Sequence, residues 1–141
     1  MSEFEDADLI FTGKDGYAPA ALGGVVNVKW GEFTLANVVT NEAELFTLPE
    51  GAQITGWVIA PSTGFNGSTP VLDVGDGTTA DRFADGIALP ANTAHVTEGF
   101  DGSEMFAALE EDTTFYATYA EASGGTTGAA KVGVFYVIVA E

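Results

Sequence analysis

Short β-rich segments recur along this chain from residue 25 onward, and no helical pattern of ordinary length accompanies them. Runs such as VVNVKW at 25–30 and TTFYATYAE at 113–121 combine β-branched and aromatic residues, which favour a pleated backbone. Turn-forming residues (glycine, proline, asparagine, aspartate and serine) separate the runs. Successive strands without intervening helices indicate an antiparallel sandwich or barrel. We therefore predict an all-β fold, an antiparallel, jelly-roll-like β-sandwich of about eight strands.

Two pairs of neighbouring runs are expected to form hairpins. The runs at 25–30 and 33–39 are separated by a short glycine-containing connection. The runs at 113–121 and 130–140 flank a flexible Ser/Gly/Thr loop and are expected to pair as a long hairpin. Gly56 lies inside another apolar run, which predicts a β-bulge or a close backbone approach there.

The final run, AKVGVFYVIVA at 130–140, carries apolar side chains on both of its faces. Val132 and Tyr136 alternate on one face, and Phe135 and Val137 lie on the other. A strand that is apolar on both faces is either central in the core or part of a subunit interface. The sequence leaves both interpretations open.

The charge and the cysteine count exclude several classes of function. Four Lys and Arg residues against 21 Asp and Glu give a formal net charge of −17. Nucleic-acid binding needs a cationic surface, and docking on an anionic membrane is disfavoured for the same reason. The chain has no cysteine and a single histidine, His95, which argues against disulfides, thiol catalysis and most zinc sites. We expect neither nucleic acid nor membrane as a partner.

The first 24 residues are acidic and differ in composition from the rest. They lack the basic and apolar regions of a secretory signal, so we expect a protein that stays in a reducing cytoplasm or in a particle assembled there. Leu9, Ile10 and Phe11 form a small apolar cluster in this polar segment. The segment is either a frayed terminus or an arm that orders against a neighbouring subunit. We assign residues 1–24 to an N-terminal arm and 25–141 to the β-sandwich domain.

No motif in the chain indicates catalysis. Carboxylate pairs are expected by chance in so acidic a chain, His95 has no nucleophile motif to serve, and the GGTTG segment at 124–128 lacks the lysine of a phosphate-binding loop. We predict that the protein is not an enzyme and uses no catalytic residue, cofactor or metal.

One acidic stretch leaves an alternative open. Asp73, Asp76, Asp81 and Asp85 follow one another closely, and oxygen-rich loops bind calcium. Their spacing does not match an EF-hand. We interpret the stretch as an acidic turn in which Arg82 pairs with a nearby carboxylate, with a calcium site as the alternative.

Aromatic residues supply two further hypotheses. Trp30, Tyr116 and Tyr119 belong either to the core or to a sugar-binding platform, and Trp57 lies in so apolar a run that we assign it to the core. Phe65 lies in a polar loop between Gly64 and Asn66, where we expect an exposed ring that contacts another chain.

Three stretches together resemble a known family. They are LPEGAQITGWVIAPSTGFNG at 48–67, VLDVGDGTTADRF at 71–83 and TTGAAKVGVFYVIV at 126–139. They resemble small β-sandwich structural proteins of tailed-bacteriophage virions, in particular head decoration (cement) proteins. The resemblance implies a non-enzymatic, usually trimeric protein that sits on the capsid surface and clamps subunits of the major capsid protein after assembly in the host cytoplasm.

The candidate contacts with that partner are Leu9, Ile10 and Phe11 in the arm and Phe65 in the loop. Two other functions stay open at this point. The protein is alternatively a head-fibre, neck or tail component of the virion, or a carbohydrate-binding module or adhesin that uses aromatic and Asn/Asp side chains in its loops.

Overall fold

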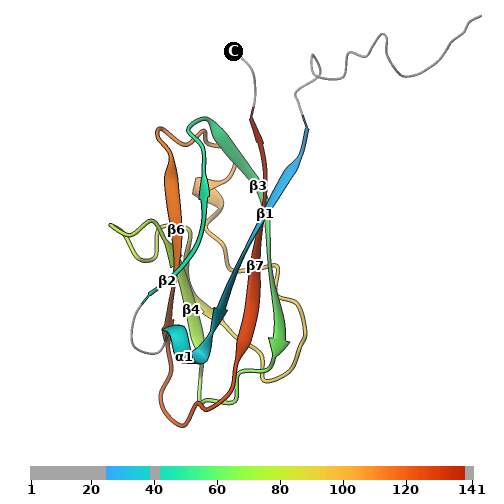
Figure 1. Cartoon of the computed structure of the whole chain (residues 1–141), viewed down its shortest axis with the longest axis vertical. Coiled ribbons are helices and arrows are strands. Elements are labelled where there is room, and N and C mark those ends of the chain that lie inside the picture. Colours follow the sequence, from blue (N-terminus) through green and yellow to red (C-terminus); the bar gives the residue numbers. More distant parts are fainter. Residues whose placement is uncertain (1–24, 39–41, 139–141) are drawn as a thin grey trace, which may run out of the picture.

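Two antiparallel sheets face each other in the computed structural model, which describes residues 25–38 and 42–138 (Figure 1). One sheet has three strands in the order β1-β7-β3, and the other has four in the order β2-β6-β4-β5. The strands are β1 (Asn27–Thr34), β2 (Ala43–Leu48), β3 (Ala52–Thr63), β4 (Val71–Gly75), β5 (Ala84–Ala88), β6 (Thr113–Ala120) and β7 (Ala129–Ile138). The predicted all-β antiparallel sandwich is confirmed, with seven strands in the described residues.

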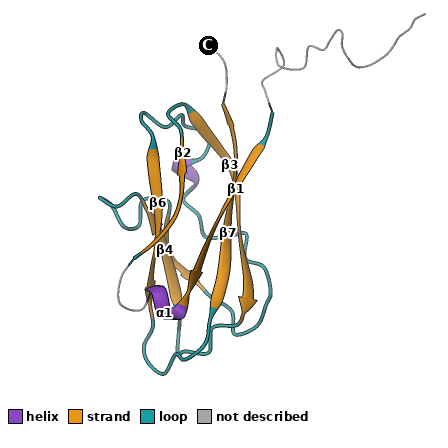
Figure 2. Ribbon diagram, viewed as in Figure 1, coloured by secondary structure: helices purple, strands orange, loops and turns teal. Residues whose placement is uncertain are grey.

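Helices contribute almost nothing to this architecture (Figure 2). The described residues contain the four-residue helix α1 (Leu35–Val38) and the 3-10 helix η3 (Gly102–Glu104). Asp101 caps η3 by accepting a hydrogen bond from the Ser103 backbone N–H. Both elements lie in connections between strands, so the strands alone define the two layers.

Both predicted hairpins are wrong. β1 continues straight through Gly31, which pairs with Val132 of β7, so this glycine marks a close approach rather than a turn. A Cβ atom at Gly31 would lie 2.6 Å from the Cα atom of Leu45 in the opposite sheet. β6 and β7 belong to different sheets, and the loop between them crosses from one layer to the other. The predicted bulge at Gly56 is confirmed by a register shift between Ile54 and Gly56 in the pairing of β3 with β7.

The core lies between the two sheets and is built from alternate residues of the strands. Its centre is an aromatic cluster around Phe115, whose ring centroid lies 4.4 Å from that of Phe83 and 5.0 Å from that of Phe46. Trp57 is 6% exposed and stacks on Phe100 at 4.6 Å, which confirms its assignment to the core. The largest fully buried side chains are Phe33, Phe65, Phe83, Phe115, Leu48, Ile54, Ile59, Leu72, Val74, Val132 and Val134.

Candidate functional site

The three-stranded sheet carries a group of apolar residues on its outward side. In each strand alternate residues point to opposite faces, and one set, including Phe33, Ile59 and Val134, is buried between the sheets. The other set includes the apolar residues Val28 and Trp30 of β1, Val58 of β3, and Phe135 and Val137 of β7, together with polar and charged residues such as Glu32, Gln53, Thr55 and Lys131. The five apolar residues of this set point away from the four-stranded sheet, and we call them the apolar face.

Register brings the members of the apolar face side by side. Gly133 in the central strand pairs with Trp30 on one side and with Val58 on the other. Phe135 pairs with Val28 and with Gly56 in the same way. One row therefore holds Trp30 and Val58 on either side of Gly133, and the next holds Val28 and Phe135 beside Gly56.

Two aromatic rings lie over glycines of neighbouring strands within these rows. A Cβ atom at Gly133 would lie 2.6 Å from the Trp30 ring, and one at Gly56 would lie 3.5 Å from the Phe135 ring. Each glycine thus leaves room for a ring from the next strand to lie down on the sheet. The result is a low, flat apolar layer rather than a set of protruding side chains.

Charged residues are scarce on this sheet. Glu32 is the one acidic residue of β1, β3 and β7, and the two basic residues are Lys29 and Lys131. The Lys131 ammonium lies 3.9 Å from the Glu32 carboxylate, with both side chains more than half exposed. Lys29 points the other way, because its ammonium donates a hydrogen bond to the backbone oxygen of Thr47 in β2. The apolar face therefore has one cation and one anion at its rim.

The strongly exposed large apolar residues of the described chain all lie on this sheet or beside it. They are Val25, Val26, Val28, Trp30, Phe106 and Ile138. Val25 and Val26 lead into β1, and Ile138 ends β7. Phe106 is 65% exposed and its backbone N–H donates to the oxygen of Ile54 in β3. Phe106 also has a φ of 64°, in the left-handed region that bulky residues avoid.

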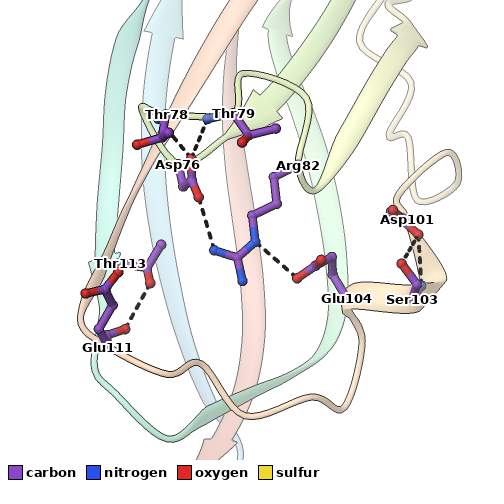
Figure 3. Close-up of polar contacts among 9 residues, drawn as sticks. All are labelled: Asp76, Thr78, Thr79, Arg82, Asp101, Ser103, Glu104, Glu111 and Thr113. Atoms are coloured by element: carbon purple, nitrogen blue, oxygen red, sulfur yellow. Dashed lines mark hydrogen bonds and ion pairs between the residues drawn. The ribbon is translucent and has the colours of Figure 1, made fainter.

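The acidic stretch from Asp73 to Asp85 forms a braced turn, as interpreted from the sequence (Figure 3). One oxygen of Asp76 accepts hydrogen bonds from the backbone N–H groups of Thr78 (2.9 Å) and Thr79 (2.7 Å). Its other oxygen pairs with Arg82 at 3.1 Å, and Arg82 also donates to Glu104 at 3.2 Å. Burial raises the pKa of Asp76, but the two amides and the guanidinium outweigh it and hold that pKa below its ordinary value of 3.8.

The remaining carboxylates of this stretch have separate surroundings. Asp73 accepts a hydrogen bond of 2.6 Å from the backbone N–H of Gly86, across the β4–β5 pair. Asp81 and Asp85 are exposed. In the described residues, no three His, Cys, Asp or Glu side chains come together in a way that would hold a metal ion.

The expectation that Phe65 is exposed is wrong. Its ring is 1% exposed and stacks between Phe33 of β1 (5.7 Å) and Tyr119 of β6 (6.0 Å). Gly128 makes this possible, because a Cβ atom there would collide with the Phe65 ring. The loop carries polar residues, but it folds over the open end of the sandwich and inserts Phe65 between the two sheets. Phe65 is therefore a core residue rather than a surface contact.

The remaining predicted site residues belong to the arm and to the aromatic platform. Leu9, Ile10 and Phe11 lie outside the described residues. Of the aromatic residues considered for a sugar platform, Tyr119 is buried, whereas Trp30 and Tyr116 lie in different sheets.

The glycine-rich loop at 124–128 is held by side chains of its own fold. Asn66 accepts hydrogen bonds from the N–H groups of Thr126 (2.8 Å) and Thr127 (3.0 Å). The Glu121 carboxylate accepts hydrogen bonds from the Tyr119 hydroxyl and from the N–H of Gly125, which together lower its pKa. These contacts fix the loop that covers Phe65.

Sequence reasoning missed the apolar face as a unit. The available signal was the final run, which is apolar on both sides and was expected to be either central in the core or part of an interface. In the structure β7 is the central strand of its sheet, and its second face points away from the four-stranded sheet. Within the part of the chain that the structure describes, no helix has the length and apolar character needed to cross a membrane.

Comparisons with known proteins place the fold among phage capsid structures. No family model and no curated protein matches the chain. A chain in the cyanophage Pam1 capsid asymmetric unit matches with a TM-score of 0.62 and 24% identity, covering 97% of both chains. Chains in the acid-stable capsid of Helicobacter pylori bacteriophage KHP30 and in the capsid of Ralstonia phage GP4 match with TM-scores of 0.60 and 0.59, both at 20% identity. These two matches cover 82% and 84% of this chain and 89% and 88% of the other chains. At these identities the likeness shows a shared fold.

Proposed function

We propose that this protein is a non-enzymatic structural component of a phage virion, and that it is a decoration (cement) protein on the outer surface of the capsid. The observation that carries the proposal is the likeness to a chain of the Pam1 capsid over 97% of both lengths. A match of that extent is to a whole small protein within a capsid, and not to one domain of a larger shell subunit. The KHP30 and GP4 matches cover nearly as much of their chains.

The surface chemistry supports a place on the outside of the particle. The net charge of −17 opposes contact with packaged nucleic acid and keeps the free protein soluble. A capsid offers many equivalent positions, so modest contacts to neighbouring subunits of the major capsid protein add up through multivalency. Trimer formation, assembly in the host cytoplasm and contacts by Leu9, Ile10 and Phe11 remain predictions.

The test is capsid binding by the purified full-length protein. Particles that lack this protein are mixed with it, separated by sedimentation and imaged. We expect density on the outer capsid surface, and replacement of Leu9, Ile10 and Phe11 by serine is expected to abolish it. The matched control replaces Glu3, Glu5 and Asp6 by serine, which alters the same segment without removing apolar side chains. Unchanged binding by the Leu9/Ile10/Phe11 variant would remove the arm from the proposal.

Imaging also separates the alternatives. Label confined to the neck, the tail or a head fibre would replace decoration by one of those roles. The dispersal of Trp30, Tyr116 and Tyr119 gives no structural support to a sugar platform. A saturable change in tryptophan fluorescence with one member of a glycan panel would nevertheless favour an adhesin and count against the capsid role.

A further inference from the structure

The segment that joins η3 to β6 is hydrogen-bonded to the outer edge of β3. The Phe106 backbone N–H donates to the Ile54 oxygen at 2.9 Å, and the Leu109 N–H donates to the Ala52 oxygen at 3.0 Å. On either side of Phe106 the chain turns inward, because Met105 packs against the core and Leu109 is 4% exposed. The place of Phe106 on the surface is therefore set by contacts before and after it.

Folding alone does not explain a phenylalanine at position 106. Its side chain is 65% exposed, more than that of any other aromatic residue that the structure describes. Its φ of 64° lies in the left-handed region, which glycine and asparagine adopt at little cost and bulky residues avoid. The residue is thus both poorly buried and strained. Strained residues cluster at functional sites, and aromatic rings are frequent anchors of protein interfaces.

Carboxylates border Phe106 on both sides along the chain. The acidic residues between positions 96 and 113, a stretch without Lys or Arg, are Glu98, Asp101, Glu104, Glu110, Glu111 and Asp112. Glu104 pairs with Arg82, whereas the last three are exposed. Glu50 joins them from the turn between β2 and β3, because its backbone N–H donates to the Asp112 carboxylate at 2.9 Å. The exposed ring therefore lies in an acidic surrounding.

This charge selects the partner. An aromatic ring bordered by carboxylates is complementary to an apolar pocket with Lys or Arg side chains at its rim. A second copy of this chain offers the same acidic border and is repelled, as are nucleic acid and anionic membranes. The partner that fits is a different protein with a cationic surface.

We infer that Phe106 anchors this protein to the capsid, with its ring in an apolar pocket of the major capsid protein that basic side chains surround. The inference rests on the proposed function, and it adds a contact within the β-sandwich domain to those predicted for the arm. One anchoring ring supplies only part of the affinity, so the two sets of contacts add to each other. The contact is made by a single chain and is compatible with any oligomeric state.

The experiment compares two glycine substitutions in the full-length protein. Phe106→Gly removes the ring and relieves the left-handed backbone. Thr69→Gly is the matched control, because Thr69 is the one other non-glycine residue of the described chain with a positive φ (49°). Thr69 lies between β3 and β4, so it follows the end of β3 that is far from Phe106.

Binding to particles that lack this protein is measured by co-sedimentation over a range of protein concentrations. We expect Phe106→Gly to raise the dissociation constant at least about tenfold and Thr69→Gly to leave it unchanged. Both variants are expected to unfold at the urea concentration of the wild type or above it, since glycine adopts a positive φ without strain. Lost binding in a variant that is no less stable separates an interface role from a structural one.

A second pair of variants tests the cationic border of the pocket. Glu110→Gln with Glu111→Gln removes two exposed carboxylates near Phe106. We expect this double variant to bind about threefold more weakly at about 0.05 M NaCl, and the difference to shrink at about 0.5 M NaCl. The matched control is Glu42→Gln with Glu44→Gln, which removes two exposed carboxylates at the other end of β2 and is expected to change nothing.

Three results would overturn the inference while leaving the proposed function standing. The first is wild-type affinity in Phe106→Gly. The second is unfolding of Phe106→Gly at a lower urea concentration than the wild type, which would show that the ring stabilises the fold. The third is equal binding by the two glutamine double variants at low salt, which would remove the cationic pocket. A wild type that does not bind the particles overturns the proposed function, and this inference with it.

Discussion

The two sheets have similar apolar inward sides, but their outward sides differ in polarity. Both bury alternate apolar residues against each other. On the outward side of the four-stranded sheet, Thr47 and Thr114 share a 2.8 Å hydrogen bond between their hydroxyl groups, and Glu44 and Asp73 add negative charge. On the outward side of the three-stranded sheet lies the apolar face. The outward side of the four-stranded sheet therefore carries polar and charged groups suited to contact with water, whereas the apolar face does not.

This difference separates what folding requires from what it does not. The alternation that builds the core fixes only one side of each strand. The outward residues are free to be polar, and in the four-stranded sheet many of them are, including Glu44, Asp73 and Thr114. An apolar outward side adds nothing to the core and increases the risk of aggregation. The apolar face is therefore a property of one sheet that the packing of the core does not explain.

The largest expected effect is on the free energy of unfolding, and it comes from a residue that packs against both sheets. Phe65→Ala removes the ring that stacks on Phe33 of one sheet and Tyr119 of the other. We expect the free energy of unfolding to fall by about 3–5 kcal/mol, as for other buried phenylalanines, in urea denaturation followed by circular dichroism. Thr118→Ala, on the outward side of β6, is the control and is expected to change it by less than about 0.5 kcal/mol. A cost below about 1 kcal/mol for Phe65→Ala would contradict its role as a core residue.

The burial of Phe65 shows where prediction from sequence stops. Strand-forming runs, turn residues and the bulge at Gly56 are local signals, and they were sufficient for the fold class. The depth of Phe65 depends on Gly128, which lies far from it in the sequence and is brought near only by the folded chain. The neighbours Gly64 and Asn66 indicate a loop, but nothing local shows that the loop folds inward.

The same limit applies to Gly31. As a local signal it indicates a turn, and the structure uses it instead for the close approach of β1 to Leu45 in the opposite layer. The apolar face is an intermediate case. Alternation in the final run identified a strand that is apolar on both sides, but only the pairing of β1, β7 and β3 brings Trp30 and Val58 beside Gly133.

A glycine-to-alanine pair compares the two sides of the three-stranded sheet. The new methyl group in Gly31→Ala points into the sandwich and meets the backbone of Leu45 at 2.6 Å, so the layers must separate. We expect a loss of about 1–3 kcal/mol in unfolding free energy. In Gly133→Ala the methyl group meets the ring of the half-exposed Trp30, which can swing into solvent.

The Gly133→Ala variant is therefore expected to lose less than about 1 kcal/mol and to show red-shifted tryptophan emission, because the Trp30 ring becomes more hydrated. Gly31→Ala is the matched comparison, since it adds the same methyl group to the pairing of β1 with β7. Equal losses in the two variants would mean that the inward and outward sides are equally constrained, and would contradict the comparison.

The smallest expected effect is a pH dependence of stability that arises from Asp76. The pKa of Asp76 lies below 3.8 because the amides of Thr78 and Thr79, with Arg82, outweigh the effect of burial. A lowered folded-state pKa gives stability that is fully present above the unfolded-state value, and that is lost as pH falls through the folded-state value. We therefore expect the contribution of the Asp76 carboxylate to disappear only below about pH 4.

Asp76→Asn isolates this contribution. At neutral pH we expect the variant to be about 1 kcal/mol less stable than the wild type, since it keeps the hydrogen-bonded turn but loses the charge that faces Arg82. Urea denaturation at about pH 7 and about pH 2.5 should show the difference shrinking on acidification, because protonation of Asp76 removes the charge by which the two proteins differ. If the difference in stability between the variant and the wild type stays constant with pH, the charge of Asp76 is not what stabilises the turn. Because Asp76 follows β4, a confirmed pH dependence would place an ionic brace on the four-stranded sheet, opposite the apolar face of its partner layer.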